Sequence, residues 1–369
     1  MSTRYQMGLG MMLALLATLS VGGCEGAALS GAEVGSRTSG VIVCPVGSDE
    51  CDYGNPNGQG IYNVEGGEHC LKTSQGPFCP TGFSTLQGAL YIEGILNRDD
   101  AWNHVSVPVS GLLSGLDVTP VSMSTRESQV TIQYVDHYGQ QGDLTDVDLN
   151  QLILEFVVGG THFQLALLLP GDLPTSVHAV TEYAVQWRIE GVTQWDSLCK
   201  DLKGEGEPAS FLGGATFDPF TAARTDALTA VTMSCQKGGI TTCMEWGYLP
   251  WQFGLNVATK QDEFLTNAHA ACIQMKRAAY CGIKSYTKDG TEIEIADAYD
   301  PSVQQSSVKT LEALWTPTGA ACLNVANRRH TDIAFPGCVP SLPPCPASDD
   351  PVTWGQSGIL ASGIFPPVK

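Results

Sequence analysis

Cysteine is the residue type whose number and spacing point most directly to chemistry in this chain of 369 residues, which has 13 of them. One, Cys24, follows Val21-Gly22-Gly23 at the end of a segment in which Arg4 precedes the apolar stretch Met7–Leu19. A basic start, an apolar run and small residues before a cysteine resemble a bacterial lipoprotein signal. We therefore expect residues 1–23 to be a signal peptide and Cys24 to carry lipid. Ordinary cleavage nearby, which would leave an odd thiol, is the alternative.

The cysteines that remain after Cys24 are even in number, which outside the cytosol predicts a disulfide framework. Three pairs are close in sequence and enclose turn-rich segments: Cys44–Cys51, Cys70–Cys79 and Cys338–Cys345. The sequence leaves the pairing of the others open: Cys199, Cys235, Cys243, Cys272, Cys281 and Cys322. A zinc site is the alternative, but the sequence has neither a CxxC pair nor zinc-spaced histidines, so we expect no metal ligand and no cofactor.

Two further segments carry side chains of types that bind ligands. The acidic segment Asp143–Asn150 presents carboxylates two residues apart, which suit Ca²⁺. An EF-hand would need Gly and Glu where Gln151 and Val157 stand, so a solvated turn is favoured. The aromatic segment Trp246–Trp251 (WGYLPW) can form a platform for a sugar, but beside Cys243 we expect it to pack in the core.

The sequence gives no direct sign of an enzyme. G-x-S-x-G, H-E-x-x-H, Walker and G-x-G-x-x-G motifs are missing from it. A catalytic triad or a pair of carboxylates can still be assembled from residues far apart in sequence. His269, inside the best helical pattern, is expected to be a hydrogen-bonded structural residue.

Residues 44–190 predict a β-rich domain. Apolar residues alternate with polar ones at Tyr183, Val185, Trp187 and Ile189, as in a strand with one buried face. The segments Ile153–Val158 and Phe163–Leu169 flank Gly159-Gly160-Thr161, which predicts a hairpin. Short strands between Gly-rich turns favour antiparallel sheets, in a sandwich or a barrel.

The best helical pattern lies in the cysteine-rich second half. Thr259-Lys-Gln-Asp262 resembles a capping box, and Gly282 suits a helix end. Helical spacing then relates Phe264, Ala268, Cys272, Met275 and Ala279. Such a helix would separate Cys272 from Cys281 by about 13 Å, whereas a disulfide needs Cα atoms within about 7 Å. We therefore expect each of them to bond to one of Cys199, Cys235, Cys243 and Cys322.

Two predictions concern the chain after this helix. Lys288-Asp289-Gly290 between Tyr286-Thr287 and Thr291–Ile295 predicts a hairpin, against whose sheet the helix would pack. The Pro-rich tail from Pro336 is expected to be irregular.

Charge excludes one class of partner. The net charge is −19. Residues 44–190 contribute most of it, since they hold 4 Lys or Arg and 18 Asp or Glu, a balance of −14. Such a surface repels phosphate backbones and anionic lipid headgroups, so nucleic acid is excluded and membrane contact is expected through the lipid alone.

The segment Ala271–Gly282 (ACIQMKRAAYCG), followed by Ser285–Thr291 (SYTKDGT), resembles the ADYC-domain proteins. Two more stretches fit that family in order: Cys235 through Trp251, ending CMEWGYLPW, and Glu312–Cys322 (EALWTPTGAAC). The resemblance implies a secreted or lipid-anchored protein of a kind found largely in myxobacteria, and it implies no activity. Ala279 stands where the four-letter motif has Asp, so any role of that carboxylate in relatives is absent here.

Together these observations predict an α+β protein, mostly antiparallel β, with one main helix. The expected parts are a signal peptide (1–23), a Gly/Ser/Ala-rich tether (24–43), a β-rich domain (44–190) and a cysteine-rich ADYC-like domain with its tail (195–369). The expected function is binding or structural, at an envelope membrane, the outer one favoured, facing periplasm or exterior. Its protein or glycan partner is left open. An extracellular hydrolase acting on polysaccharide, peptide or ester bonds is the alternative.

Overall fold

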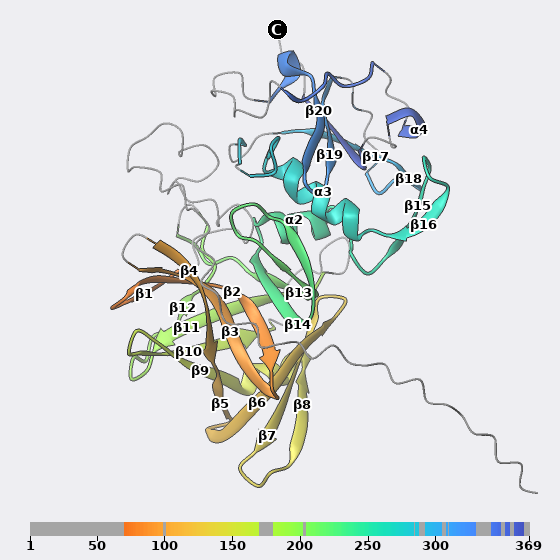
Figure 1. The fold of residues 1–369 in the computed structure, drawn as a ribbon. Coiled ribbons are helices and arrows are strands. Elements are labelled where there is room, and N and C mark those ends of the chain that lie inside the picture. Colours follow the sequence, from red (N-terminus) through yellow and green to blue (C-terminus); the bar gives the residue numbers. More distant parts are fainter. Residues whose placement is uncertain are drawn as a thin grey trace, which may run out of the picture. The chain divides into compact units, whose positions relative to one another are not determined.

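Alternating apolar residues between glycine turns build one large antiparallel sheet, which the computed structural model shows together with a smaller helical part (Figure 1). The structure describes residues 70–98, 101–169, 180–201, 204–283, 285–287, 292–304, 308, 310–329, 341–347, 351–354 and 358–364. The expected signal peptide, the tether, Cys24, Cys44, Cys51 and Cys338 lie outside these ranges.

The large sheet has 14 strands in the order β4-β3-β2-β14-β13-β11-β10-β9-β5-β6-β7-β8, with β1 beside β2 and β12 beside β11. Their bounds are β1 Leu71–Thr73, β2 Gly76–Leu86, β3 Ala89–Arg98, β4 Ala101–Pro108, β5 Ser110–Leu113, β6 Leu116–Arg126, β7 Gln129–Asp136, β8 Gln141–Thr145, β9 Leu152–Val158, β10 Thr161–Leu168, β11 Glu182–Ile189, β12 Asp196–Ser197, β13 Ala209–Phe217 and β14 Arg224–Cys235. The 3₁₀ helix η1 (Asp146–Gln151) joins β8 to β9.

The sheet folds back on itself, because β6 contacts β2, β3, β13 and β14 across a common core. Phe83, Tyr183 and Phe211 lie in this core, each at most 2% exposed. Burial of one such side chain contributes about 1.5–3 kcal/mol, so the apolar faces of the strands hold the two layers together. The mostly antiparallel β architecture expected from the sequence is confirmed.

The hairpin expected around Gly159 and Gly160 is confirmed. Val158 of β9 pairs with Thr161 of β10, which leaves a two-residue loop. Both glycines have positive φ, 58° and 76°, as a type I′ turn requires. Thus a local glycine signal sets the register of the two strands that later form one wall of the candidate site.

The sheet continues past the boundary expected near residues 190–195. β13 pairs with β11 through Glu182 and Ser210, and β14 pairs with β2 through Val231 and Phe83. β13 and β14, which belong to the expected cysteine-rich domain, are therefore part of the large sheet of the β-rich domain.

The helical part combines two small sheets with short helices. Its elements are α2 Gly239–Glu245, β15 Phe253–Asn256, β16 Gln261–Phe264, α3 Thr266–Lys276, β17 Glu294–Asp297, β18 Tyr299–Asp300, β19 Leu311–Thr316, β20 Gly319–Leu323, η2 Val325–Asn327, α4 Pro351–Trp354 and β21 Leu360–Gly363. One sheet has the order β16-β15-β18 and the other β17-β21-β19-β20. Among the described helices, none is both long and apolar enough to cross a bilayer.

The main helix exists, but its expected ends are wrong. Residues 261–264 form β16 of a hairpin, because the Asn256 Oδ1 atom accepts hydrogen bonds from the backbone N–H groups of Ala258 and Thr259 and makes a turn. Phe264 is therefore a half-exposed strand residue and not part of a helix face. At the other end Ala278, with φ 50°, breaks the helix four residues before Gly282.

The helix packs against β19, β20 and β21, so a sheet does cover it. The expected hairpin turn at 288–291 lies outside the described residues. The strand after it, β17, pairs with β21, whereas the Tyr286 N–H donates to the Arg277 carbonyl. The prediction of an irregular tail is wrong at β21, which is a central strand of this sheet.

Four disulfides join described residues: Cys70–Cys79, Cys199–Cys235, Cys243–Cys272 and Cys322–Cys345. The first forms as expected, and the expected Cys338–Cys345 pair is wrong because Cys345 bonds to Cys322. Cys272 bonds to Cys243 and so fixes α3 to α2. Cys281 is also disulfide-bonded, and its partner is none of the four expected, since each of those bonds elsewhere.

Candidate functional site

The segment after α3 surrounds a buried ion pair. The carboxylate of Glu312 on β19 accepts hydrogen bonds from the Arg329 guanidinium (Nη2–Oε2, 2.7 Å) and from the Tyr280 hydroxyl (2.8 Å). The Ser362 hydroxyl on β21 donates to the same carboxylate and accepts from the Trp315 indole. The expectation that Tyr280 is buried with its hydroxyl bonded is confirmed, at 4% exposure.

The negative charge of Glu312 is compensated within the network by the positive charge of Arg329. Burial opposes the charge of Glu312, but the Arg329 charge and its hydrogen bonds outweigh burial and lower the pKa of Glu312. Burial and the Glu312 charge raise the pKa of Tyr280. The side chains of Glu312 and Arg329 are at most 1% exposed, so they cannot touch a ligand. The network stabilises the fold and is not a site for chemistry.

Two glycines allow this arrangement. Gly282 has φ +69°, and a Cβ there would lie 2.1 Å from the Thr318 carbonyl oxygen. A Cβ at Gly319 would lie 2.8 Å from the Gly282 nitrogen, and the next residue, Ala320, donates its N–H to the Tyr280 carbonyl. The turn between β19 and β20 therefore packs directly on the backbone of the motif.

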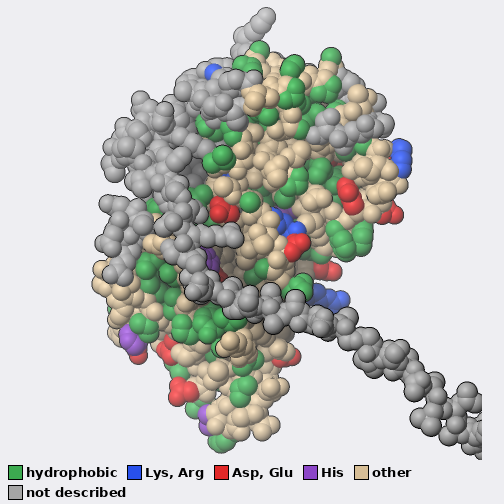
Figure 2. Space-filling view, in the orientation of Figure 1, with side chains coloured by type: hydrophobic (Ala, Val, Ile, Leu, Met, Phe, Trp, Pro, Cys, Tyr) green, Lys and Arg blue, Asp and Glu red, His purple; other side chains and the backbone are tan. Residues whose placement is uncertain are grey.

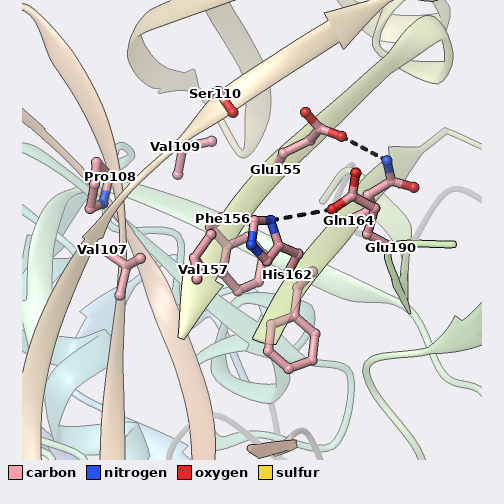
Figure 3. Close-up of a pocket in the computed structure, with 11 residues that line it drawn as sticks. Val107, Pro108, Val109, Ser110, Glu155, Phe156, Val157, His162, Gln164 and Glu190 are labelled. Carbon is pink, nitrogen blue, oxygen red and sulfur yellow. Dashed lines mark hydrogen bonds and ion pairs between the residues drawn. The ribbon is translucent and has the colours of Figure 1, made fainter. Parts of the chain in front are cut away.

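A pocket of about 410 Å³ opens on the outer face of the large sheet (Figure 3). One wall is apolar and comes from the passage between β4 and β5: Val107, Pro108 and Val109. The other wall comes from β9, β10 and the residue after β11. We call it the polar wall because it carries Glu155, His162, Gln164 and Glu190, beside the apolar residues Phe156, Val157 and Phe163.

The polar wall is built from cross-strand rows. In one row the Arg188 Nε donates to Gln164 (2.7 Å), and the Gln164 amide donates to Glu155 (2.7 Å). In the next row His162 Nδ1 lies 3.2 Å from a Glu190 carboxylate oxygen. Figure 3 shows the side chains of Glu155, His162, Gln164 and Glu190 close together, with dashed lines joining Gln164 to Glu155 and His162 to Glu190. The His162 and Glu190 side chains are 61% and 59% exposed, so water reaches them freely.

The other sequence candidates do not converge on this pocket. Asp146 accepts a hydrogen bond from Gln129 at the start of η1, and Asp148 is exposed, as a solvated turn predicts. Tyr248 is fully buried and donates to Asp297, whereas Trp246 and Trp251 are partly buried and pack against the same core. His269 is fully buried, and its Nε2 atom lies 3.0 Å from the Ile240 carbonyl oxygen. Burial lowers the pKa of His269 to about 4, so it is a neutral structural residue.

An acidic cluster lies between the sheet and α2, and no sequence pattern predicts it. Glu182 begins β11, Glu207 precedes β13 and Glu245 ends α2; the first two are 7% exposed. Burial, with a hydrogen bond to Glu245, raises the pKa of Glu182 to about 7. Burial also raises the pKa of Glu207. Within the part of the chain that the structure describes, no group of three or more His, Cys, Asp or Glu side chains is placed to hold a metal ion.

Comparison with known proteins finds one family. The model of the ADYC domain matches residues 146–329, so the match begins in η1, inside the large sheet, and ends at Arg329 of the buried pair. It thus includes the polar wall of the pocket as well as the motif around Tyr280. No curated protein and no solved structure matches the chain.

Replacing Glu312 by Gln should lower the free energy of unfolding by about 3–5 kcal/mol, because Arg329 would stay buried without a counter-charge. Tyr280→Phe is the matched control, since it keeps the ion pair and removes one hydrogen bond. It should lower the free energy of unfolding by only about 1.5–3 kcal/mol. Urea unfolding with the disulfides intact measures both. Equal stability of E312Q and the parent chain would contradict this account of the network.

Glu182→Gln should flatten the dependence of the melting temperature on pH. The folded-state pKa of Glu182, about 7, is above the ordinary value of 4.5, so its contribution to stability is complete below pH 4.5 and is lost as pH rises through 7. At about pH 8 the variant should therefore melt at a higher temperature than the parent chain. Asp117→Asn, at an exposed carboxylate, is the control. A parent melting temperature that rises over this range would refute the assignment.

Proposed function

Because this chain is an ADYC-domain protein, we propose that it is a lipid-anchored protein of the bacterial cell envelope that binds a partner through the pocket beside β9 and β10. The polar wall of that pocket lies within the matched family domain, which supports a role for the pocket in this protein. The apolar wall comes from residues before the match.

The observation that favours binding over catalysis is that the polar groups of the polar wall are already hydrogen-bonded or ion-paired and partly open to water. Its carboxylates are already engaged, Glu155 by Gln164 and Glu190 by His162, and the second pair is more than half exposed. A catalytic acid or base usually needs a site that excludes water and tunes its proton affinity. An open wall of bonded polar groups facing an apolar wall is instead the usual make-up of a recognition site.

One observation favours the alternative, an extracellular hydrolase of polysaccharide, peptide or ester bonds. Glu155, His162 and Glu190 share one wall, and two carboxylates beside a ligand are the minimum for glycoside hydrolysis. In that case a bound partner would leave the pocket chemically cleaved, whereas a binding protein releases it intact.

The anchor rests on the sequence. Cys24 follows the leader and the small residues that precede lipidated cysteines, and the Gly/Ser/Ala-rich tether (24–43) gives the folded part reach from the membrane. The acidic balance of residues 44–190 disfavours direct contact with anionic headgroups. Among the described residues on the face in view, Figure 2 shows scattered charges and no continuous basic patch. We place the protein at the outer membrane in preference to the inner one, facing the periplasm or the exterior.

Mass spectrometry of the mature N-terminus should find diacylglycerol on Cys24, because lipid transfer to the cysteine precedes cleavage at this kind of signal. Cys24→Ser should move the protein from the membrane fraction to the soluble fraction. An unmodified N-terminus at any other residue would show that the anchor is wrong.

A photo-crosslinking residue at Val157, which is exposed and lines the pocket, should give a covalent adduct in the cell that makes the protein. The same residue at Leu228, 97% exposed and outside the pocket, is the control and should give none. The mass of the adduct separates an intact partner from a cleaved one. Labelling at neither site, or equally at both, would contradict a binding function for the pocket.

A further inference from the structure

The strand β9 has a backbone edge that no described strand covers. Residues 152–155 pair with β5, from Leu152 opposite Leu113 to Glu155 opposite Ser110. Residues 156–158 pair only with β10 among the described strands. Antiparallel pairing alternates between residues that bond to one neighbour and to the other. Since Val158 and Thr161 close the two-residue hairpin, the N–H and C=O of Val157 point to the uncovered side.

This edge of β9 is left unpaired among the described strands because the chain switches from pairing with β3 to pairing with β9 at Val109. The Val109 N–H donates to the Leu90 carbonyl of β3, and β4 pairs with β3 through Val107 and Ile92. Pro108, at the point of divergence, has no N–H to donate to β9. The pocket is therefore the wedge between β4 and β9, and the edge of β9 forms part of its floor.

An uncovered strand edge beside a groove is a template for a further strand. The charge of the residues that line the wedge determines which side chains an added strand should carry. The lining residues include two carboxylates, Glu155 and Glu190, and no Lys or Arg, and residues 44–190 as a whole carry an acidic excess. Glu155 lies two residues from Val157 on the same face of β9, within diagonal reach of a long side chain on an added strand. The valines of the opposite wall suit apolar residues.

We propose that the pocket binds an extended polypeptide segment in which Lys or Arg alternates with apolar residues, and that this segment adds a strand to the edge of β9 at residues 156–158. The proposal rests on the proposed binding function and names its ligand class. Backbone hydrogen bonds to Val157 would position the segment, and the carboxylates of the polar wall would select its charge.

The test uses the folded protein without its leader and a fluorescein-labelled Lys-Val-Lys-Val-Lys-Val peptide, followed by fluorescence anisotropy. The peptide should bind, and binding should weaken as salt is added. Glu-Val-Glu-Val-Glu-Val should not bind, and the Lys peptide with methylated backbone nitrogens should lose at least tenfold in affinity. Glu155→Gln and Glu190→Gln should each weaken binding about two- to fivefold, the range for exposed charge pairs. Asp117→Asn, an exposed carboxylate outside the pocket, should have no effect.

Three results would overturn the ligand class: no binding of the Lys peptide, undiminished binding of its methylated form, or equal binding of the Glu peptide. A cationic oligosaccharide, the chitosan hexamer, serves as the rival probe. Binding of the hexamer without the Lys peptide would make the ligand a glycan and leave the binding function standing. Failure of every probe together with failure of crosslinking at Val157 would remove the binding function itself.

Discussion

The buried pair of Glu312 and Arg329 is the interaction on which the arrangement of the helical part depends. A buried charge without a partner would destabilise the fold by several kcal/mol. The groups around Glu312 and Arg329 must therefore be positioned to form hydrogen bonds with them. Tyr280 and Ser362 bond to the carboxylate, and the Met275 carbonyl at the end of α3 accepts a hydrogen bond from Arg329. The pair thus fixes the end of α3, β19, β21 and the chain after η2 at one point. This explains why Ala278, Ala279 and Tyr280 form a buried structural centre.

Local signals were enough to predict the parts of the fold that local geometry controls. Gly159 and Gly160 readily adopt the positive φ of a tight hairpin. The alternation in β11 predicts the burial of Tyr183 and Val185, but Ile189 on the expected buried face is 40% exposed. The helix limits failed because two local signals competed: the capping residues near Thr259 were outweighed by the turn that Asn256 makes. The left-handed Ala278 carries no such signal, because alanine is a good helix former.

Other features depend on contacts between distant residues, which a sequence pattern does not reveal. β21 lies in the Pro-rich tail yet pairs with β17 and β19, and its Ser362 hydroxyl donates to Glu312 of the buried ion pair. The same holds for Cys345, which bonds to Cys322 in place of its nearer neighbour in sequence. The acidic cluster has no sequence signal either, because Glu182 and Glu245 meet only when α2 packs against the sheet.

The candidate site follows from a different constraint: the chain pairs with β3 along β4 and then with β9 along β5. Pro108 and Val109 carry β4 to β3 while Ser110 begins the pairing of β5 with β9, so a wedge must remain where the two paths separate. The hairpin at Gly159 and Gly160 sets the register that brings Glu155 beside Gln164 and His162 beside Val157. Paired strands form both sides of the wedge, so under the proposed function the ordering cost of binding would fall mainly on the ligand. The buried network and the wedge are therefore separate. The network stabilises the helical part, and the wedge, where we propose that binding occurs, combines strands of the matched domain with Val107, Pro108 and Val109, which precede it.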